Sequence, residues 1–364
     1  MDVGGNVANK ATENSIVDNQ EVVWYDARKA PFSLHGFSDP LNDEIFRRVP
    51  KDIAEATREG VANLGRMSAG GRVRFSTNSP YVSIHTKQLY IDRSPHETLL
   101  ETSGFDLYID GDFGSRCVRE FRMPYDMTDG YEALVYFGDF RNRYITINFP
   151  IYSVVENLEI GINPSAVLGE EKPYRDIKPV YFYGSSIVNG TGASRPGLIY
   201  PNVISRELNI DFTSYGFAGM AMGEQVMAEW LSKQDMSVFV CDYDHNAPTT
   251  EHLENTHYAF YETFRKEKPD TPYIMITRPD YWTRIYEQEH ILQRRDIIMA
   301  SYLKARANGD KNVYFIDGMS FFTGAHQYEC SVDGVHPNDV GYLRMADSIG
   351  TMIKYVLERG CVVD

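Results

Sequence analysis

Short apolar runs alternate with longer amphipathic segments throughout the second half of the chain. Five apolar runs follow residue 178, and each precedes a segment with helical character. Successive parallel strands need a crossover between them, usually a helix, so this alternation predicts a parallel sheet with helices on both faces. The runs cover residues 180–183, 211–215, 238–241, 273–276 and 313–316, and the clearest helical segments cover residues 249–266, 287–307 and 338–358.

The first half of the chain has a different rhythm, with little helical periodicity. Short runs rich in β-branched and aromatic residues recur about every ten residues and are separated by Gly, Asp and Pro. Several runs alternate apolar and polar residues, which indicates strands with one buried face and predicts a β-sandwich. The runs cover residues 72–76, 81–85, 105–109, 133–137 and 144–148.

The sequence predicts two domains joined near residue 170. A chain of 364 residues exceeds one average domain, and a hydrophobic content of 43% can supply a core for each of two. The stretch Gly169-Glu-Glu-Lys-Pro-Tyr-Arg-Asp has the polar composition of a linker. We therefore predict a loose N-terminal segment over residues 1–20, a sandwich over residues 21–170 and an α/β domain over residues 178–364.

Residues with catalytic potential follow four of the five predicted parallel strands. In open sheets of this kind, ligands bind beyond the carboxyl ends of the strands, so these residues would meet at one edge. They comprise a nucleophile, two oxyanion donors and a base, which is the layout of a serine hydrolase site. In chain order they are Gly184-Ser185-Ser186, Gly219, Asn246 and Asp333-Gly-Val-His336-Pro337.

The spacing of Asp333 and His336 suits a catalytic acid and base. The carboxylate can accept a hydrogen bond from Nδ1–H of the imidazole and leave Nε2 as a general base. Either Ser185 or Ser186 could then be the nucleophile, and spacing alone does not separate the two. An exposed Asp–His pair and a turn or helix-cap serine are the structural alternatives, but the shared placement at strand ends favours catalysis.

Gly219 and Asn246 are candidates for stabilising a developing oxyanion. A backbone N–H from Gly219 and the side-chain amide of Asn246 could each donate a hydrogen bond, typically worth about 3 kcal/mol in the transition state. The alternatives are a tight turn that needs a positive φ at Gly219 and an Asx turn at Asn246 before Pro248. We interpret the neighbouring Asp242 and Asp244 as loop carboxylates that orient other groups.

Three residues are candidates for contacts with the substrate. Tyr281 and Trp282 follow the fourth strand, and aromatic faces stack on sugar rings. Buried packing is the commoner role of such aromatic side chains. His245, next to Asn246, is the third candidate, and packing or exposure to solvent is its alternative role.

Charge and composition exclude several classes of function. A net charge of -15 repels nucleic acid and anionic membranes, so we predict neither as a partner. No stretch reaches the roughly 18 apolar residues of a membrane span, and no signal peptide is visible, which predicts a cytoplasmic protein. A chain whose leader had been removed would look the same. The four cysteines and nine histidines lack metal-binding spacing, so we predict no metal and no cofactor.

The four blocks resemble those of the SGNH hydrolases, also called GDSL esterases. The first block of that family usually reads Gly-Asp-Ser, and here Ser185 replaces the Asp. The resemblance implies that Ser186 is the nucleophile and that Ser186, Gly219 and Asn246 form the oxyanion hole. It also implies a three-layer, flavodoxin-like domain over about residues 178–358. The third block departs from the family's Gly-x-Asn-Asp, whereas Asp333, His336 and the following Pro are intact.

The first half adds a second resemblance. Ser103-Gly-Phe-Asp-Leu-Tyr108 is similar to the Gly-x-Asp-Leu-Tyr signature of sandwich regions that precede some SGNH domains. The order of domains also resembles carbohydrate esterase family 2, in which a jelly roll precedes the hydrolase. This resemblance implies a serine esterase that removes O-acetyl groups from carbohydrates. Two alternatives stay open, an esterase or thioesterase for non-sugar acyl groups and a non-catalytic carbohydrate-binding protein. A face of the sandwich could also pair subunits into a homo-oligomer.

Overall fold

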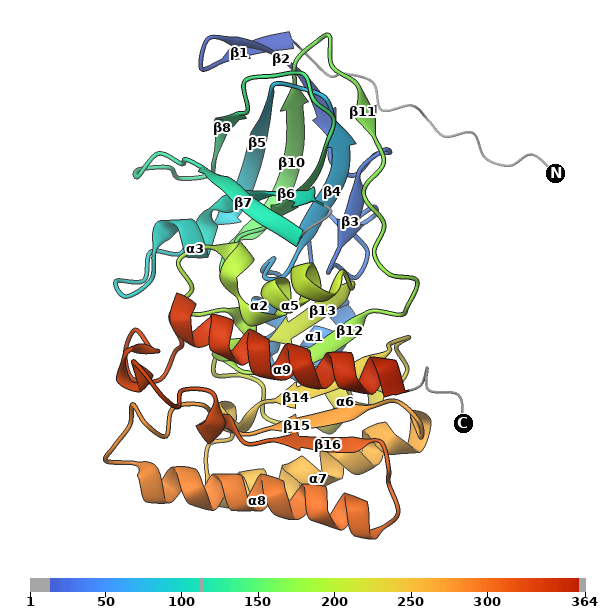
Figure 1. Ribbon diagram of the computed structural model, residues 1–364, viewed down its shortest axis with the longest axis vertical. Coiled ribbons are helices and arrows are strands. Elements are labelled where there is room, and N and C mark those ends of the chain that lie inside the picture. The colour runs from blue at the N-terminus through green and yellow to red at the C-terminus, as the bar shows by residue number, and fades with distance from the viewer. Residues whose placement is uncertain (1–13, 112–113, 360–364) are drawn as a thin grey trace, which may run out of the picture. The chain divides into compact units, whose positions relative to one another are not determined.

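The computed structural model describes residues 14–111 and 114–359 and divides into two compact units. The sandwich unit comprises the chain up to Arg48, Arg66–Pro173 and Arg195–Gly197, and the α/β unit comprises Val49–Gly65, Tyr174–Ser194 and the chain from Leu198 onward (Figure 1). No helix in the described ranges has the length and hydropathy needed to cross a membrane.

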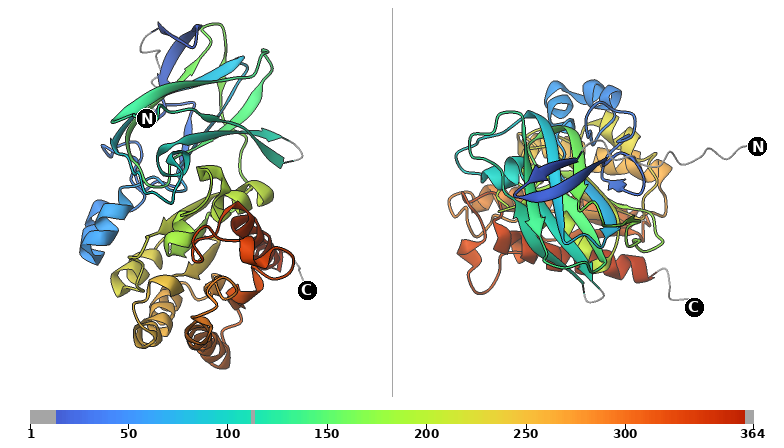
Figure 2. Two further views of the ribbon diagram at one scale, coloured as in Figure 1. Left: turned by 90° about the vertical axis from the view of Figure 1, so that its left-hand side faces the viewer. Right: turned by 90° about the horizontal axis from the view of Figure 1, so that it is seen from above.

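The sandwich unit contains two antiparallel sheets that face each other across a shared core (Figure 2). One sheet has the order β1-β2-β10-β5-β8, and the other has the order β11-β4-β9-β6-β7 with β3 paired to β4. The strands of the first are β1 (Asn14–Val17), β2 (Gln20–Asp26), β10 (Val154–Ile162), β5 (Tyr81–Tyr90) and β8 (Gly130–Tyr136). Those of the second are β11 (Leu168–Gly169), β4 (Arg72–Thr77), β9 (Arg143–Asn148), β6 (Phe105–Gly111), β7 (Gly114–Phe121) and β3 (Ser33–His35). A short helix, α3 (Leu99–Ser103), precedes β6.

Alternating side chains from both sheets build this core. Phe75 and Ile147 of one sheet and Ile84 and Ile160 of the other are fully buried in one cluster. All five strands predicted for this half are present as β4, β5, β6, β8 and β9. Strand β7 was not predicted. Most of its side chains are at least partly exposed, so its sequence has no clear run of apolar residues.

The N-terminus differs from the predicted loose segment. Residues 14–17 form β1, which pairs antiparallel with β2 from Asn14 opposite Val23 to Val17 opposite Gln20. Val17 is buried against Val22 and Trp24, and this small apolar cluster holds the hairpin in place. The rest of the predicted loose segment, residues 1–13, lies outside the described residues.

The α/β unit contains a five-stranded parallel sheet with the order β13-β12-β14-β15-β16. All five predicted strands and the three predicted helices are confirmed to within a few residues. The strands are β12 (Val180–Gly184), β13 (Phe212–Gly216), β14 (Val238–Asp242), β15 (Tyr273–Ile276) and β16 (Val313–Ile316). The helices after residue 180 are α4 (Ser186–Asn189), α5 (Tyr200–Leu208), α6 (Gln225–Leu231), α7 (Thr250–Glu267), α8 (Gln288–Ala307) and α9 (Asp339–Arg359).

Helices cover both faces of this sheet (Figure 2). Helices α5 and α9 pack against each other on one face, and α6, α7 and α8 pack side by side on the other. The order of the strands reverses between β12 and its two neighbours, β13 and β14. Ligands bind at such a point in open α/β sheets, and Ser185, Ser186 and Asp242 lie there.

Two helices from the first half of the sequence belong to the α/β unit. The predicted boundaries placed them in the sandwich, but α1 (Lys51–Thr57) and α2 (Glu59–Gly65) lie in the other unit. Val49, Ala54 and Val61 are fully buried in the same cluster as Phe217 and Met227. Each helix has only seven residues, so neither shows the extended periodicity that would reveal it in the sequence.

Candidate active site

Ser185 and Ser186 have distinct structural roles at the end of β12. Ser185 is fully buried and caps α4, because its hydroxyl accepts a hydrogen bond from the Ile187 N–H at 3.2 Å. Ser186 is the first residue of the helix, and its Oγ lies 2.9 Å from Nε2 of His336. Of the two serines, Ser186 is thus the one whose hydroxyl contacts a base.

A tight turn before α9 sets the orientation of His336. One carboxylate oxygen of Asp333 accepts hydrogen bonds from the backbone N–H groups of Val335, at 2.9 Å, and His336, at 2.7 Å. The other lies 2.7 Å from Nδ1 of His336. Partial burial alone would raise the pKa of Asp333, but these hydrogen bonds from His336 and Val335 lower it below its ordinary value. The ionised carboxylate therefore holds the imidazole with Nδ1 protonated and Nε2 toward Ser186.

The loop after Ser186 is packed closely against this turn. Gly192 has a φ of +90°, and a Cβ at this position would lie 2.6 Å from the Pro337 carbonyl oxygen. Only glycine allows the two loops to approach so closely. Helix α9 holds the same loop, since the Tyr342 hydroxyl donates to the Thr191 carbonyl at 2.8 Å. The nucleophile and the base are consequently fixed by one packed arrangement.

Asn246 is hydrogen-bonded to the turn that carries Gly219. Gly219 has a φ of +69° and is exposed, and among the described residues no heavy atom beyond its chain neighbours lies within 4 Å of where its Cβ would be. Asn246 is buried, and its amide donates to the Phe217 carbonyl at 2.7 Å. An amide carries two N–H groups, so the second can be donated to another acceptor. Both candidate oxyanion donors are thereby attached to the turn that follows β13.

The segment after Gly219 is stabilised by residues that the sequence did not reveal. Glu224 accepts hydrogen bonds from the Tyr183 hydroxyl at 3.0 Å and from the Met222 N–H at 3.1 Å. Its other carboxylate oxygen pairs with Nε of Arg58, between α1 and α2, at 2.8 Å. Gly60 lets α2 approach the same segment, because a Cβ there would lie 2.4 Å from Sδ of Met220.

Replacing Arg58 by methionine is expected to lower kcat about three- to tenfold with KM nearly unchanged. Glu224 loses its ionic partner, so the segment that carries Gly219 is held less firmly. Steady-state kinetics on nitrophenyl acetate measure the effect, and Arg58→Lys should restore part of it. Lys51→Met is the matched control, because Lys51 on α1 is exposed and pairs with the exposed Glu55 at 3.9 Å. Equal kcat values for the two methionine variants would contradict the prediction.

A buried ion pair holds the segment around Asn246. Asp244 is fully buried, and Arg294 of α8 donates to its carboxylate at 2.7 Å and also to its carbonyl. The Arg278 N–H donates to the same carboxylate at 3.0 Å. This matches the orienting role predicted for Asp244. Asp242 differs, because burial and the nearby negative charge of Asp244 raise its pKa well above the ordinary value.

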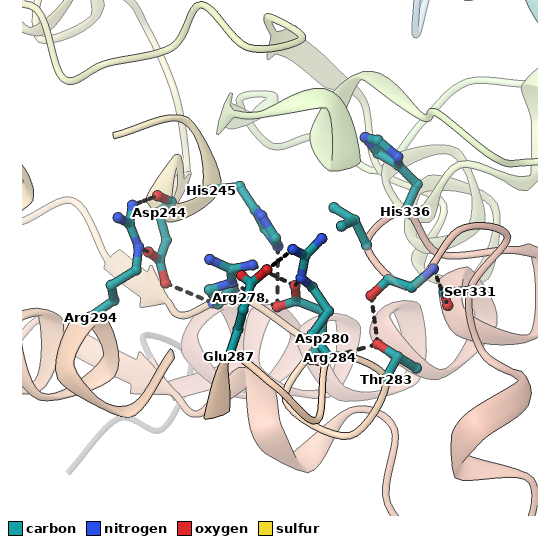
Figure 3. Close-up of polar contacts among 12 residues, drawn as sticks. Asp244, His245, Arg278, Asp280, Thr283, Arg284, Glu287, Arg294, Ser331 and His336 are labelled. Carbon is teal, nitrogen blue, oxygen red and sulfur yellow. Dashed lines mark hydrogen bonds and ion pairs between the residues drawn. The ribbon is translucent and has the colours of Figure 1, made fainter. Parts of the chain in front are cut away.

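The three predicted substrate contacts have different surroundings. Trp282 donates from Nε1 to the Met319 carbonyl at 2.9 Å and lines a pocket of about 590 Å³ that Asp333 also lines. Tyr281 packs edge-on against Trp282, with ring centroids 5.0 Å apart, and does not line this pocket. His245 is nearly buried, with Nε2 3.4 Å from the Asp280 carboxylate (Figure 3), and burial lowers its pKa.

Comparisons with known proteins show what each part of the chain is similar to. Residues 177–354 match the model of the GDSL-like lipase/acylhydrolase family. The C-terminal half of the chain belongs to this family. Residues 22–168 match the GxDLY model, which describes the N-terminal region of SGNH-type esterases. The chain is therefore a carboxylic ester hydrolase of the GDSL type with the N-terminal region of SGNH-type esterases.

Several solved structures share the fold of both parts. A GDSL-like lipase from Bacteroides ovatus is 27% identical, with a TM-score of 0.83 over 93% of this chain and 98% of that chain. The salicylyl-acyltransferase SsfX3 of a tetracycline pathway is 19% identical, with a TM-score of 0.69 over 90% and 95%. A family two carbohydrate esterase from Clostridium thermocellum, solved with cellohexaose, is 14% identical, with a TM-score of 0.55 over 80% and 94%. Comparison with curated protein sequences gave no match.

Proposed function

We propose that this GDSL-type hydrolase is a serine esterase that removes O-acetyl groups from carbohydrates. The observation that supports the proposal most strongly is a pair of consecutive hydrogen bonds. Ser186 Oγ lies 2.9 Å from His336 Nε2, and His336 Nδ1 lies 2.7 Å from the Asp333 carboxylate. A hydroxyl, an imidazole and a carboxylate in this order form the general nucleophile–base–orienter arrangement of acyl transfer.

The proposed reaction has two steps. His336 Nε2 takes the proton of Ser186 while Oγ attacks the ester carbonyl, and Asp333 stabilises the imidazolium that forms. The imidazolium then protonates the sugar oxygen, so the alcohol leaves and Ser186 carries the acetyl group. A water molecule, deprotonated by the same His336, attacks the acetyl-enzyme. Acetate leaves and the Ser186 hydroxyl is restored, which balances both steps.

The proposed oxyanion hole consists of the N–H groups of Ser186 and Gly219 and the amide of Asn246. Preorganised donors stabilise the tetrahedral intermediate because they need no reorientation as its charge develops. Two features support this proposal. Asn246 is buried and oriented by its hydrogen bond to Phe217, and Ser186 opens helix α4, where the first backbone N–H groups lack helical partners.

Two observations support a carbohydrate as the substrate. Trp282 and Tyr328 line one pocket with Asp333, and aromatic side chains of this kind can stack on sugar rings. The chain also shares its order of units with a family two carbohydrate esterase solved with cellohexaose. We further propose that the sandwich is a jelly roll, which the facing orders β2-β10-β5-β8 and β4-β9-β6-β7 support.

The test is acetate release by the purified protein from acetylated mannan, xylan and pectin oligosaccharides. We expect release from one class and none by the Ser186→Ala variant. Cleavage of nitrophenyl acetate without release from any sugar would leave an esterase and remove the carbohydrate from the proposal. Faster turnover of nitrophenyl octanoate than of the acetate would favour an esterase for longer acyl groups. Sugar binding without turnover of any ester would favour the non-catalytic alternative.

A further inference from the structure

A buried carboxylate follows strand β15 at the edge of the sheet where the proposed site lies. Asp280 has no exposed surface, and Arg278 donates to its two oxygens at 2.7 and 2.5 Å. Nε2 of His245 lies 3.4 Å from one of these oxygens. Burial alone would raise the pKa of Asp280, but His245 and Arg278 lower it, so the carboxylate is ionised.

The backbone that follows Asp280 reaches the loop of the proposed base. The Asp280 carbonyl accepts hydrogen bonds from the N–H groups of Thr283, at 3.2 Å, and Arg284, at 3.0 Å, which closes a tight turn. We call residues 280–284 the Asp280 turn. The Thr283 hydroxyl donates a hydrogen bond to the Gly334 carbonyl oxygen at 2.7 Å. Gly334 lies between Asp333 and His336 and has a φ of +89°.

We propose that the Asp280 turn is a positioning element that joins the Asn246 block to the Asp333–His336 loop. On one side, Asp280 contacts His245, the residue directly before Asn246. On the other side, Thr283 holds the peptide between Asp333 and His336. The oxyanion donor and the base thus have a common support. This inference rests on the proposed function, because it assigns a role to residues around the same site.

Two physical arguments support a positioning role. Asp280 is fully buried, so it acts through its neighbours and not by contact with a substrate. A buried carboxylate is also costly to desolvate and is retained where its partners satisfy it in a defined geometry. Here the partners of Asp280 are Arg278 and His245. The backbone N–H of Arg278 also donates a hydrogen bond to Asp244. A shift of the base by about 1 Å can lower a rate by roughly a hundredfold, so one hydrogen bond in this support affects turnover.

Replacing Thr283 by valine tests the link to the base. Valine keeps the shape of threonine but cannot donate to the Gly334 carbonyl, so kcat should fall about tenfold while KM stays within about twofold. Thr283→Ser restores the hydroxyl and should recover most of the lost kcat. The matched control is Thr323→Val, because Thr323 is exposed and its hydroxyl donates to the Ser320 carbonyl, three residues before it, at 3.0 Å. That variant should turn over like the wild type.

A double-mutant cycle tests whether the turn joins the two blocks. The effects of His245→Phe and Thr283→Val on log kcat should be less than additive, because either change loosens the same support. Additive effects, a Thr283→Val variant as active as Thr323→Val, or failure of Thr283→Ser to recover activity would each overturn the inference. The proposed function fails separately, through persistent activity of Ser186→Ala.

Discussion

Replacing Ser186 by alanine is expected to lower kcat for ester hydrolysis by at least about a thousandfold. The variant has no hydroxyl for His336 to deprotonate, so no acyl-enzyme can form. Activity that remains would come from the oxyanion donors and from substrate binding. Nitrophenyl acetate hydrolysis measures the loss, and circular dichroism shows whether the variant is folded.

The neighbouring serine offers a close control. Ser185 lies next to Ser186, but its hydroxyl caps α4 and is fully buried. Ser185→Ala should therefore cost about 1 kcal/mol of stability and far less activity than Ser186→Ala. If Ser186→Ala turned over like the wild type, or if Ser185→Ala were the more impaired variant, the assignment of the nucleophile would be wrong.

Replacing Arg294 by methionine is expected to lower the free energy of unfolding by about 3–5 kcal/mol. Arg294 and Asp244 are both buried, with side-chain exposures of 2% and 0%, and lie 2.7 Å apart. Methionine fills much of the same space but leaves the Asp244 carboxylate without its ionic partner. It also leaves the Ala247 carbonyl without the hydrogen bond that Arg294 donates at 3.0 Å. Urea unfolding of the purified variant measures the change.

The adjacent residue on the same helix is the control for Arg294. Arg295 pairs with Asp317 at 2.7 Å, but both side chains are more than a quarter exposed. Arg295→Met should change the free energy of unfolding by less than about 1 kcal/mol, because solvent screens an exposed ion pair. Equal changes for the two variants would show that burial of the Asp244–Arg294 pair is not important for stability.

The strands and long helices of the α/β unit could be predicted because their signal is local. A buried parallel strand is a short apolar run, and α7, α8 and α9 are long enough to show a helical period. Even there the helical period does not fix which apolar side chains of α9 are buried. Val340 and Leu343 are 45% and 43% exposed, whereas Tyr342 is fully buried beneath the nucleophile loop. Periodicity indicates that a helix has an apolar side, but packing decides which side chains it buries.

Some residues of the candidate site could likewise be predicted from the sequence, and others could not. The Asp333–His336 pair could be predicted from local spacing, because a carboxylate three residues before an imidazole can pair with it within one turn. The sequence also predicted that Ser186 and Asn246 lie at the same edge of the sheet, because the carboxyl ends of parallel strands lie together. Spacing could not choose between Ser185 and Ser186, since that depends on which hydroxyl caps α4 and which reaches the base.

The distant residues that support the site could be found only in the folded chain. Arg58 forms an ion pair with Glu224, which lies more than 160 residues later in the sequence, and Thr283 donates a hydrogen bond to Gly334, which lies 51 residues later. Such pairs produce no repeating pattern in the sequence, because each residue lies in or beside a short helix or a turn that has no regular spacing of apolar residues. Burial of Asp280 and Asp244 is likewise a product of packing, which removes water and makes each carboxylate depend on its buried partners, Arg278 and His245 for Asp280 and Arg294 for Asp244. Short-range spacing therefore predicts the chemistry that we propose for this chain, whereas long-range packing determines how firmly the residues of the proposed site are held.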